Sequence, residues 1–229
     1  MKAQFDKLFG SGKEYDEIDS NGNTSEISQP VKKAPAKKSN EDQFDLFGFS
    51  DESDEPTANH SYYATLENTT HFYQIVQGDL PVKLLMQNLL NQTSVCFDTE
   101  TTGIDALNAE LVGMSFSFEK GKGFYVPFPE NQEEAQNLIE KFRPFFENES
   151  IEKIGQNMKY DLKILSNYNI QVKGKLFDTM IAHYLINPDM RHNMDVLSET
   201  YLKYAPKSIE TLIGKKGKNQ LSMRDVPLE

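Results

Sequence analysis

Three apolar segments in the middle of the chain restrict the folds that it can adopt. They cover residues 94–97, 111–118 and 123–127 and are bounded by polar and turn-forming residues. Apolar runs of this length between turn signals are typical of β-strands. Because short turns favour antiparallel neighbours, we predict that the three strands form an antiparallel meander.

The segments on either side of these strands are expected to form helices and two further strands. A strand is expected at residues 71–76, and apolar residues at helical spacing predict an amphipathic helix over residues 80–90. Further helices are expected at residues 132–146, 160–168, 179–186 and 194–204, with a short strand at residues 152–155. Strands followed by helices, with one strand returning through a helix, predict an α/β protein with a mixed β-sheet flanked by helices.

The first 60 residues differ in composition from the rest, so we divide the chain into an arm at residues 1–60 and a domain at residues 61–229. The net charge is -11, and residues 1–60, with 7 basic and 13 acidic side chains, carry six of these negative charges. The segment is rich in Ser, Asn, Gly and Pro. It lacks the apolar surface that would offset the entropy of ordering, and we predict a disordered arm.

Composition also excludes several classes of protein. The balance of 24 Lys and Arg against 35 Asp and Glu argues against a general nucleic-acid coat, since phosphate binding depends on basic side chains. Cys96 is the single cysteine, which excludes a disulfide framework and a Cys-rich zinc site and fits a reducing compartment. No stretch approaches the roughly 20 apolar residues of a membrane span, and the N-terminus does not resemble a signal peptide. We therefore expect a cytoplasmic protein with no membrane partner.

Two acidic residues follow directly after the first of the three apolar runs. Asp98 and Glu100 are two residues apart, so on a strand their side chains point to the same face. Two carboxylates held this close repel each other, and one stays protonated unless a cation intervenes. Ligand sets made of oxygen alone select hard divalent ions such as Mg²⁺ or Mn²⁺. The alternative interpretation is a polar strand end whose acidic side chains face water.

A second polar cluster, at residues 154–165, combines a helix start with another acidic residue. Asn157 can cap the helix that begins just beyond it, and Asp161 lies four residues later on the same side of that helix. The alternative is an ordinary cap followed by an exposed aspartate, which the helix dipole favours. Together with Asp98 and Glu100, Asp161 supplies carboxylates of the kind that two-metal phosphodiester hydrolysis requires.

Five short motifs give the sequence a specific family resemblance. They are FDTET at residues 97–101, GQNMKYD at residues 155–161, FDTM at residues 177–180, RHNMD at residues 191–195 and GKNQL at residues 217–221. In order and spacing they resemble the proofreading 3′-to-5′ exonuclease domain of bacterial DNA polymerase I. The resemblance implies the four-carboxylate exonuclease superfamily, a ribonuclease H-like fold, a role in DNA replication and repair, and two divalent metal ions, Mg²⁺ or Mn²⁺.

The resemblance also implies roles for individual residues. Asp98, Glu100 and Asp161 match the catalytic metal ligands, with Asp98 bridging both ions. The residues that match the family's contacts to the single-stranded 3′ end of a DNA primer are Thr101, Ile104, Gln156, Asn157, Tyr160 and Arg191. Asp178 is also shared with the family, but we expect it to cap the helix that begins near Thr179.

The third motif of the family is not in this sequence. It supplies a Tyr that positions the attacking water and, four residues later, the fourth carboxylate; here only Tyr15 and Asp19, in the predicted arm, have that spacing. We expect a fragment with little or no nuclease activity, from an active parent protein that also contains a polymerase domain. The alternatives are an RNA-trimming exonuclease of the same superfamily and a module that binds primer ends or a clamp without cutting.

Two further segments have features of binding sites. Lys215 and Lys216 lie between two glycines in a basic C-terminal region and can meet DNA phosphates, although a solvated surface loop is the alternative. In the arm, Gln43, Leu46 and Phe47 resemble the short Gln-x-x-Leu-Phe peptides that bind bacterial sliding clamps. Residual hydrophobicity is the other interpretation of that short match.

Overall fold

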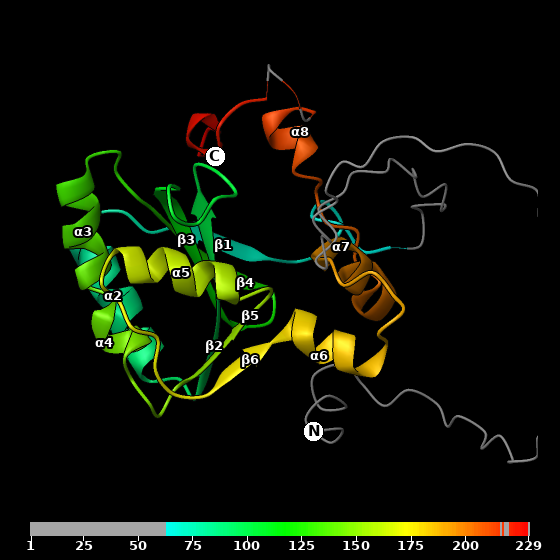
Figure 1. The fold of residues 1–229 in the computed structure, drawn as a ribbon, viewed down its shortest axis with the longest axis horizontal. Coiled ribbons are helices and arrows are strands. Elements are labelled where there is room, and N and C mark those ends of the chain that lie inside the picture. The colour runs from blue at the N-terminus through cyan, green and yellow to red at the C-terminus, as the bar shows by residue number, and fades with distance from the viewer. Residues whose placement is uncertain (1–62, 216, 218–219, 229) are drawn as a thin grey trace, which may run out of the picture. The chain divides into compact units, whose positions relative to one another are not determined.

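The computed structural model describes residues 63–215, 217 and 220–228, which are organised around a mixed sheet of six strands. The strands are β1 Phe72–Ile75, β2 Ser94–Thr101, β3 Leu111–Glu119, β4 Lys122–Pro127, β5 Glu152–Gly155 and β6 Leu176–Asp178. Their order across the sheet is β1-β4-β3-β2-β5-β6. The pairs β2 with β3 and β3 with β4 are antiparallel, which confirms the predicted meander (Figure 1). The pairs β1 with β4, β2 with β5 and β5 with β6 are parallel.

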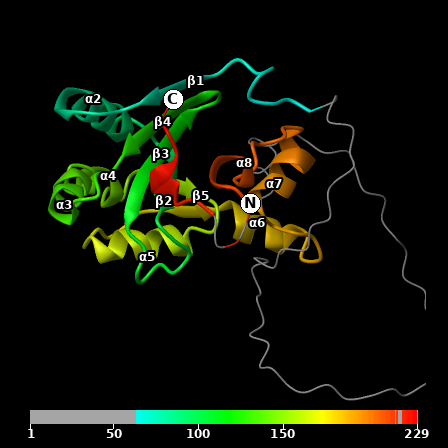
Figure 2. The same cartoon turned by 90° about the horizontal axis from the view of Figure 1, so that it is seen from above.

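Helices flank this sheet. The α-helices are α2 Asp79–Leu90, α3 Gln132–Glu140, α4 Arg143–Phe146, α5 Lys159–Asn167, α6 Thr179–Ile186, α7 Met194–Leu197 and α8 Glu210–Ile213. Figure 2 shows α2, α3, α4 and α5 on one side of the sheet and α6, α7 and α8 on the other. The α/β class and the mixed sheet flanked by helices are thus confirmed. Among the described residues, no helix has both the length and the apolar character needed to cross a bilayer.

Two predicted helices are wrong in extent, and three short elements were not predicted: β6, α8 and the 3-10 helix Met223–Asp225. Residues 132–146 form the separate helices α3 and α4, because Pro144 has no N–H group to continue the hydrogen-bond ladder. Residues 194–204 begin as α7 and continue as a π-helix, Ser198–Leu202. Strand β6 and helix α8, with three and four residues, are too short to show a periodic pattern.

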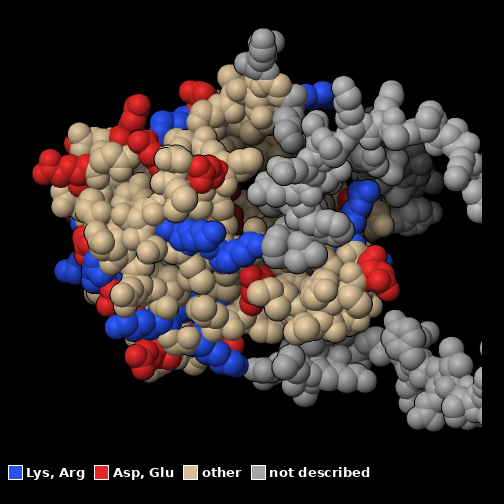
Figure 3. Space-filling model, in the orientation of Figure 1, with Lys and Arg blue, Asp and Glu red and all other residues tan. Residues whose placement is uncertain are grey.

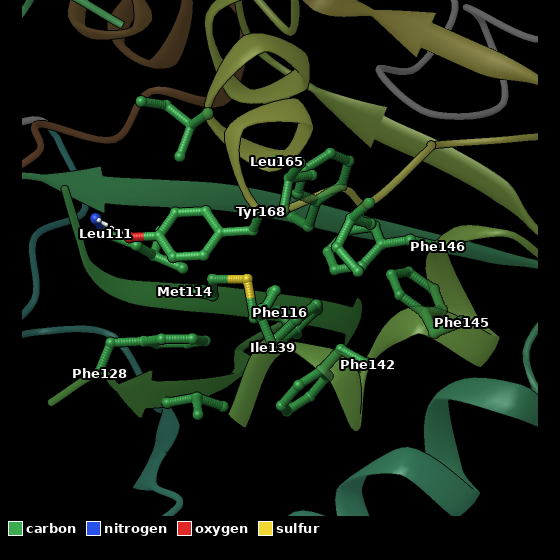
Figure 4. Close-up of a cluster of buried hydrophobic side chains, with 14 of the residues drawn as sticks. Leu111, Met114, Phe116, Phe128, Ile139, Phe142, Phe145, Phe146, Leu165 and Tyr168 are labelled. Atoms are coloured by element: carbon green, nitrogen blue, oxygen red, sulfur yellow. Dashed lines mark hydrogen bonds between the residues drawn. The ribbon is translucent and has the colours of Figure 1, made fainter. Parts of the chain in front are cut away.

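An aromatic core joins the sheet to α4 and α5 (Figure 4). The ring of Phe116 stacks on Phe142 with centroids 5.4 Å apart, and Phe97 meets Phe146 edge-on at 5.3 Å. The buried hydroxyl of Tyr168, at the end of α5, accepts a hydrogen bond from the backbone N–H of Leu111 at 3.0 Å. These contacts fix β2 and β3 against the helices, and so hold the strand that carries Asp98 and Glu100.

Some predictions fall outside the described residues. These are the predicted disordered arm at residues 1–60, the clamp-binding residues Gln43, Leu46 and Phe47 within it, and Lys216 in the C-terminal region.

Candidate active site

Strand β2 presents alternate residues to opposite faces of the sheet. Val95, Phe97 and Thr99 are buried, whereas Asp98 and Glu100 are only partly buried. This alternation places the two acidic side chains on one face, as their spacing predicted. The strand continues through Thr101, so the acidic residues lie within β2 and not beyond its end.

Asp161 lies in the first turn of α5 and reaches the edge of β2. Strand β5 pairs with β2 only as far as Cys96, which lies opposite Ile154. The N–H group of Thr99 is therefore not used by β5. Asp161 Oδ1 accepts a hydrogen bond from Thr99 N at 3.0 Å and another from Thr99 Oγ1 at 2.6 Å. Only 3% of Asp161 is exposed, so the alternative of a solvated aspartate early in a helix is wrong.

Burial and neighbouring carboxylates raise the pKa of all three acidic side chains. Burial, and then the carboxylates of Asp161 and Glu100, raise the pKa of Asp98 to about 7. Burial and the charge of Asp161 also raise the pKa of Glu100. Burial raises the pKa of Asp161 to about 6, although its hydrogen bonds from Thr99 act in the opposite direction. A group of acids that are unfavourable as anions is favourable for binding a cation.

The donor set fits a hard divalent ion. Asp98, Glu100 and Asp161 offer only carboxylate oxygens, which Mg²⁺ and Mn²⁺ prefer. Within the described part of the chain, no three His, Cys, Asp or Glu side chains are gathered closely enough to hold one ion. Binding of one ion by all three acids therefore requires their side chains to move closer together.

Asp178 has a wider role than the cap that was predicted for it. Its carboxylate accepts from Met180 N at 2.9 Å and Ile181 N at 3.3 Å, which confirms the cap on α6. It also accepts from Asn157 N at 3.1 Å and Met158 N at 2.8 Å. One side chain therefore holds both the start of α6 and the loop that leads into α5.

The predicted capping role of Asn157 is wrong. Helix α5 begins at Lys159, and its N-terminal cap position, Met158, has no side-chain hydrogen bond. Asn157 has a left-handed backbone with φ of 57°, a conformation that asparagine tolerates better than most residues. Its Oδ1 atom is buried without a hydrogen-bond partner, so the side-chain carbonyl of Asn157 has an unused acceptor.

Tyr160 joins α5 to the turn that follows β2. Its hydroxyl donates to the carbonyl of Gly103 and lies within hydrogen-bonding distance of Thr101 Oγ1. Thr101 Oγ1 is also bonded to Gly103 O, at 3.0 Å. The next residue, Ile104, is 87% exposed. The structure thus brings Thr101 and Tyr160 together and leaves the apolar side chain of Ile104 open to solvent beside them.

Gln156 connects the loop before α5 with the segment that contains Arg191. Its Nε2 atom donates to His192 O at 2.6 Å, and its Oε1 atom accepts from Thr179. Arg191 itself is exposed. Gln156 therefore links the segment of Arg191 to the start of α6 through the two ends of its amide group.

Glycine is required where Tyr125 crosses the sheet. Gly113 pairs with Glu100, and a Cβ atom at Gly113 would lie 2.0 Å from the hydroxyl oxygen of Tyr125. The pKa of Tyr125 is raised by burial and then by the charge of Glu100. From the sequence, no role was assigned to Tyr125, which lies in none of the motifs, or to Thr99, which was named only as part of FDTET.

The C-terminal segment, which is far along the sequence from the three acidic residues, contains basic side chains. Lys215 is exposed, and Arg224 is placed beside the sheet, with its guanidinium 3.3 Å from Leu111 O and 3.4 Å from Phe128 O. Figure 3 shows a short row of basic side chains over α5, with acidic and basic groups mixed elsewhere on this face.

The pattern of the 3′-5′ exonuclease family matches residues 73–227, a range that includes all three acidic residues. DNA polymerase I of Borreliella burgdorferi is 34% identical over 184 residues, which are 78% of this chain and 20% of that protein. DNA polymerase I of Pseudomonas aeruginosa is 31% identical over 166 residues, which are 69% of this chain and 18% of that protein. The chain spans about a fifth of the length of these relatives.

Solved structures share the fold at lower identity. The catalytic core of RRP6 from Trypanosoma brucei has a TM-score of 0.54 and 20% identity, over 72% of this chain and 42% of that one. The Trypanosoma brucei RNase D complex with RNA U12 has a TM-score of 0.52 and 13% identity, over 62% of this chain and 50% of that one. At this identity the likeness establishes the fold alone, a ribonuclease H-like α/β sheet.

Proposed function

The chain belongs to the 3′-5′ exonuclease family of DNA polymerase I, and on that premise we propose that its domain removes mispaired nucleotides from the 3′ end of a DNA primer by metal-assisted hydrolysis. This editing would serve DNA replication and repair in the cytoplasm of a bacterial cell, in a parent protein with a polymerase domain. The observation that carries the proposal is the cluster of Asp98, Glu100 and Asp161, whose ionised forms disfavour one another until a cation is bound.

Asp98, Glu100 and Asp161 would hold two ions, Mg²⁺ or Mn²⁺. Bound ions of this kind activate water and stabilise the leaving oxygen of a phosphodiester. The protein positions the carboxylates: β2 fixes Asp98 and Glu100 on one face, and the first turn of α5 brings Asp161 to the same strand.

The surrounding residues would bind the single-stranded primer end. Ile104, which is 87% exposed, offers an apolar surface for the last base, and Tyr160 and Thr101 hold the turn that presents it. We propose that Asn157 also contacts the primer end, while Gln156 supports the segment of Arg191. Arg191 and Lys215 are exposed cations suited to phosphate, and we propose the same contact for Lys216.

The alternatives are an RNA-trimming exonuclease and a binding module that does not cut. The RNA-bound neighbour shares only the fold, whereas the relatives at 31% and 34% identity are DNA polymerases, which favours DNA over RNA as substrate. A module that binds ends or a sliding clamp without cutting has no reason to retain three mutually repelling acids. We propose that Gln43, Leu46 and Phe47 contact a clamp in addition to the editing function.

The test is digestion of a 5′-labelled primer with a mispaired 3′ end, in Mg²⁺ or Mn²⁺, alongside matched RNA of the same sequence. We propose that residues 1–229 alone digest weakly, because the Tyr and the fourth carboxylate of the family's third motif are not in this sequence. An extended version that includes this motif should shorten the DNA, and its Asp98→Asn variant should not. Preferential digestion of RNA, or equal activity of the variant, would contradict the proposed function.

A further inference from the structure

Thr99 is bonded twice to a single oxygen of Asp161. Both the backbone N–H and the hydroxyl of Thr99 donate to Asp161 Oδ1, at 3.0 and 2.6 Å. We propose that Thr99 is a positioning residue, which fixes the orientation of the Asp161 carboxylate toward a divalent ion. The inference rests on the proposed function, since it assigns Thr99 a task at the same site.

The geometry at β2 explains why Thr99 can do this. Strand β5 no longer pairs with β2 beyond Cys96, so the N–H of Thr99 is available to a side chain from α5. Thr99 points into the protein between Asp98 and Glu100, which alternate to the other face. It therefore contacts the third acid without occupying the space in front of the first two.

Two donors on one oxygen restrict what Asp161 can offer. A carboxylate oxygen has about two lone-pair sites, and the two hydrogen bonds from Thr99 use both sites of Oδ1. Oδ2 is then the oxygen available to an ion. Thr99 is 7% exposed and Asp161 is 3% exposed, so water has little access to replace a lost hydroxyl. Without that hydroxyl, the carboxylate is held by the backbone N–H alone and gains rotational freedom.

A purely structural role makes a different prediction. If the hydroxyl of Thr99 only satisfied a buried polar atom, its removal would lower the stability of the domain and leave the orientation and ion affinity of Asp161 unchanged. Partners that orient metal ligands typically contribute 10- to 100-fold to metal affinity. The two roles are therefore separable by measuring affinity and orientation together with stability.

The experiment compares Thr99→Val, Thr99→Ala and Thr99→Ser in the 229-residue chain. Ser198→Ala serves as the matched control, because Ser198 is also buried and its hydroxyl donates to Tyr204 O at 3.0 Å, outside the acidic cluster. Mn²⁺ affinity is measured by calorimetric titration, and the orientation of Asp161 by crystal structures of the metal-free proteins. We expect about 10- to 100-fold weaker Mn²⁺ binding and more than one Asp161 orientation for Thr99→Val and Thr99→Ala, with Thr99→Ser and Ser198→Ala close to the wild type.

Wild-type affinity and a single Asp161 orientation in Thr99→Val would overturn the inference. If that variant does not fold, Thr99→Ser and Thr99→Ala decide the matter, because they differ only by the hydroxyl. If the wild-type chain binds no Mn²⁺, the proposed metal site fails, while the orientation of Asp161 in the metal-free variants still tests the role of Thr99.

Discussion

The carboxylate of Asp178 accepts a hydrogen bond from the backbone N–H of Met158 at 2.8 Å, across 20 positions in the sequence. The same side chain caps α6, so the starts of α5 and α6 share one acceptor. The position of Asp161, three residues beyond Met158, therefore depends on a residue in another helix cap.

Removal of this acceptor should destabilise the domain. Asp178→Ala leaves the N–H groups of Asn157, Met158 and Met180 without their partner, and we expect a loss of about 2–4 kcal/mol in the free energy of unfolding. Urea unfolding of the metal-free chain measures this change. The control is Asp195→Ala, in the first turn of α7 but with no capping bond, which should change stability by less than about 0.5 kcal/mol. Equal effects of the two substitutions would contradict the dual role of Asp178.

Stability of the metal-free chain should fall as the pH rises toward neutrality. The pKa of Asp98 is about 7 in the folded protein against an ordinary value of 3.8, so between these values the folded state keeps a proton that the unfolded state has lost. The free energy of unfolding therefore decreases over this range, and the raised pKa of Asp161 acts in the same direction. Asp98→Asn should be about 1–3 kcal/mol more stable than the wild type at pH values above 7, with little difference near pH 4.

Urea unfolding at the two pH values, with and without Mg²⁺, provides the measurement. Added Mg²⁺ should stabilise the wild type at neutral pH and have a smaller effect on the Asp98→Asn variant. A stability difference that does not depend on pH would show that the charge of Asp98 is not its cause.

The turn after β2 should loosen when Tyr160 loses its hydroxyl. Tyr160→Phe removes the hydrogen bond to Gly103 O and the contact with Thr101 Oγ1, a loss of about 1 kcal/mol. We expect faster hydrogen exchange of the amides around Gly103 and weaker binding of a single-stranded 3′ end. Tyr184→Phe on α6, where 49% of the side chain is exposed, should leave both measurements unchanged. Unaltered exchange around Gly103 in Tyr160→Phe would count against this prediction.

Charge reversal in the C-terminal region should weaken DNA binding. In the double variant Lys215→Glu and Lys216→Glu, we expect weaker single-strand binding and a salt dependence that is less steep by about 0.7 for each lost phosphate contact. Fluorescence anisotropy over a range of salt concentrations measures both effects. The double variant Lys83→Glu and Lys120→Glu, with both changes at exposed positions outside this region, controls for net charge. Identical salt dependence in the wild type and the double variant would remove this region from the binding surface.

Local sequence patterns were sufficient to predict those structural features that depend only on residues close together in the chain. The two-residue period of a strand placed Asp98 and Glu100 on one face, and the same kind of pattern gave the antiparallel meander. The cap formed by Asp178 was also predictable, because an N-terminal cap bonds to amides two and three residues later. The break between α3 and α4 was also predictable from Pro144, but the prediction of one helix over residues 132–146 used the spacing of apolar residues alone.

Tertiary structure alone decided which distant groups meet. Asn157 does not cap α5. The backbone N–H groups at the start of that helix donate instead to Asp178, which lies 20 and 21 positions away, and the backbone of Asn157 is left-handed. The bonds from Thr99 to Asp161 span 62 residues and exist because β5 ends before it reaches Thr99. Sequence identified the acidic residues as a set, since side-chain chemistry and spacing are local properties. Their burial, their altered pKa values and the partner that orients Asp161 arise only when strand, loop and helix pack together.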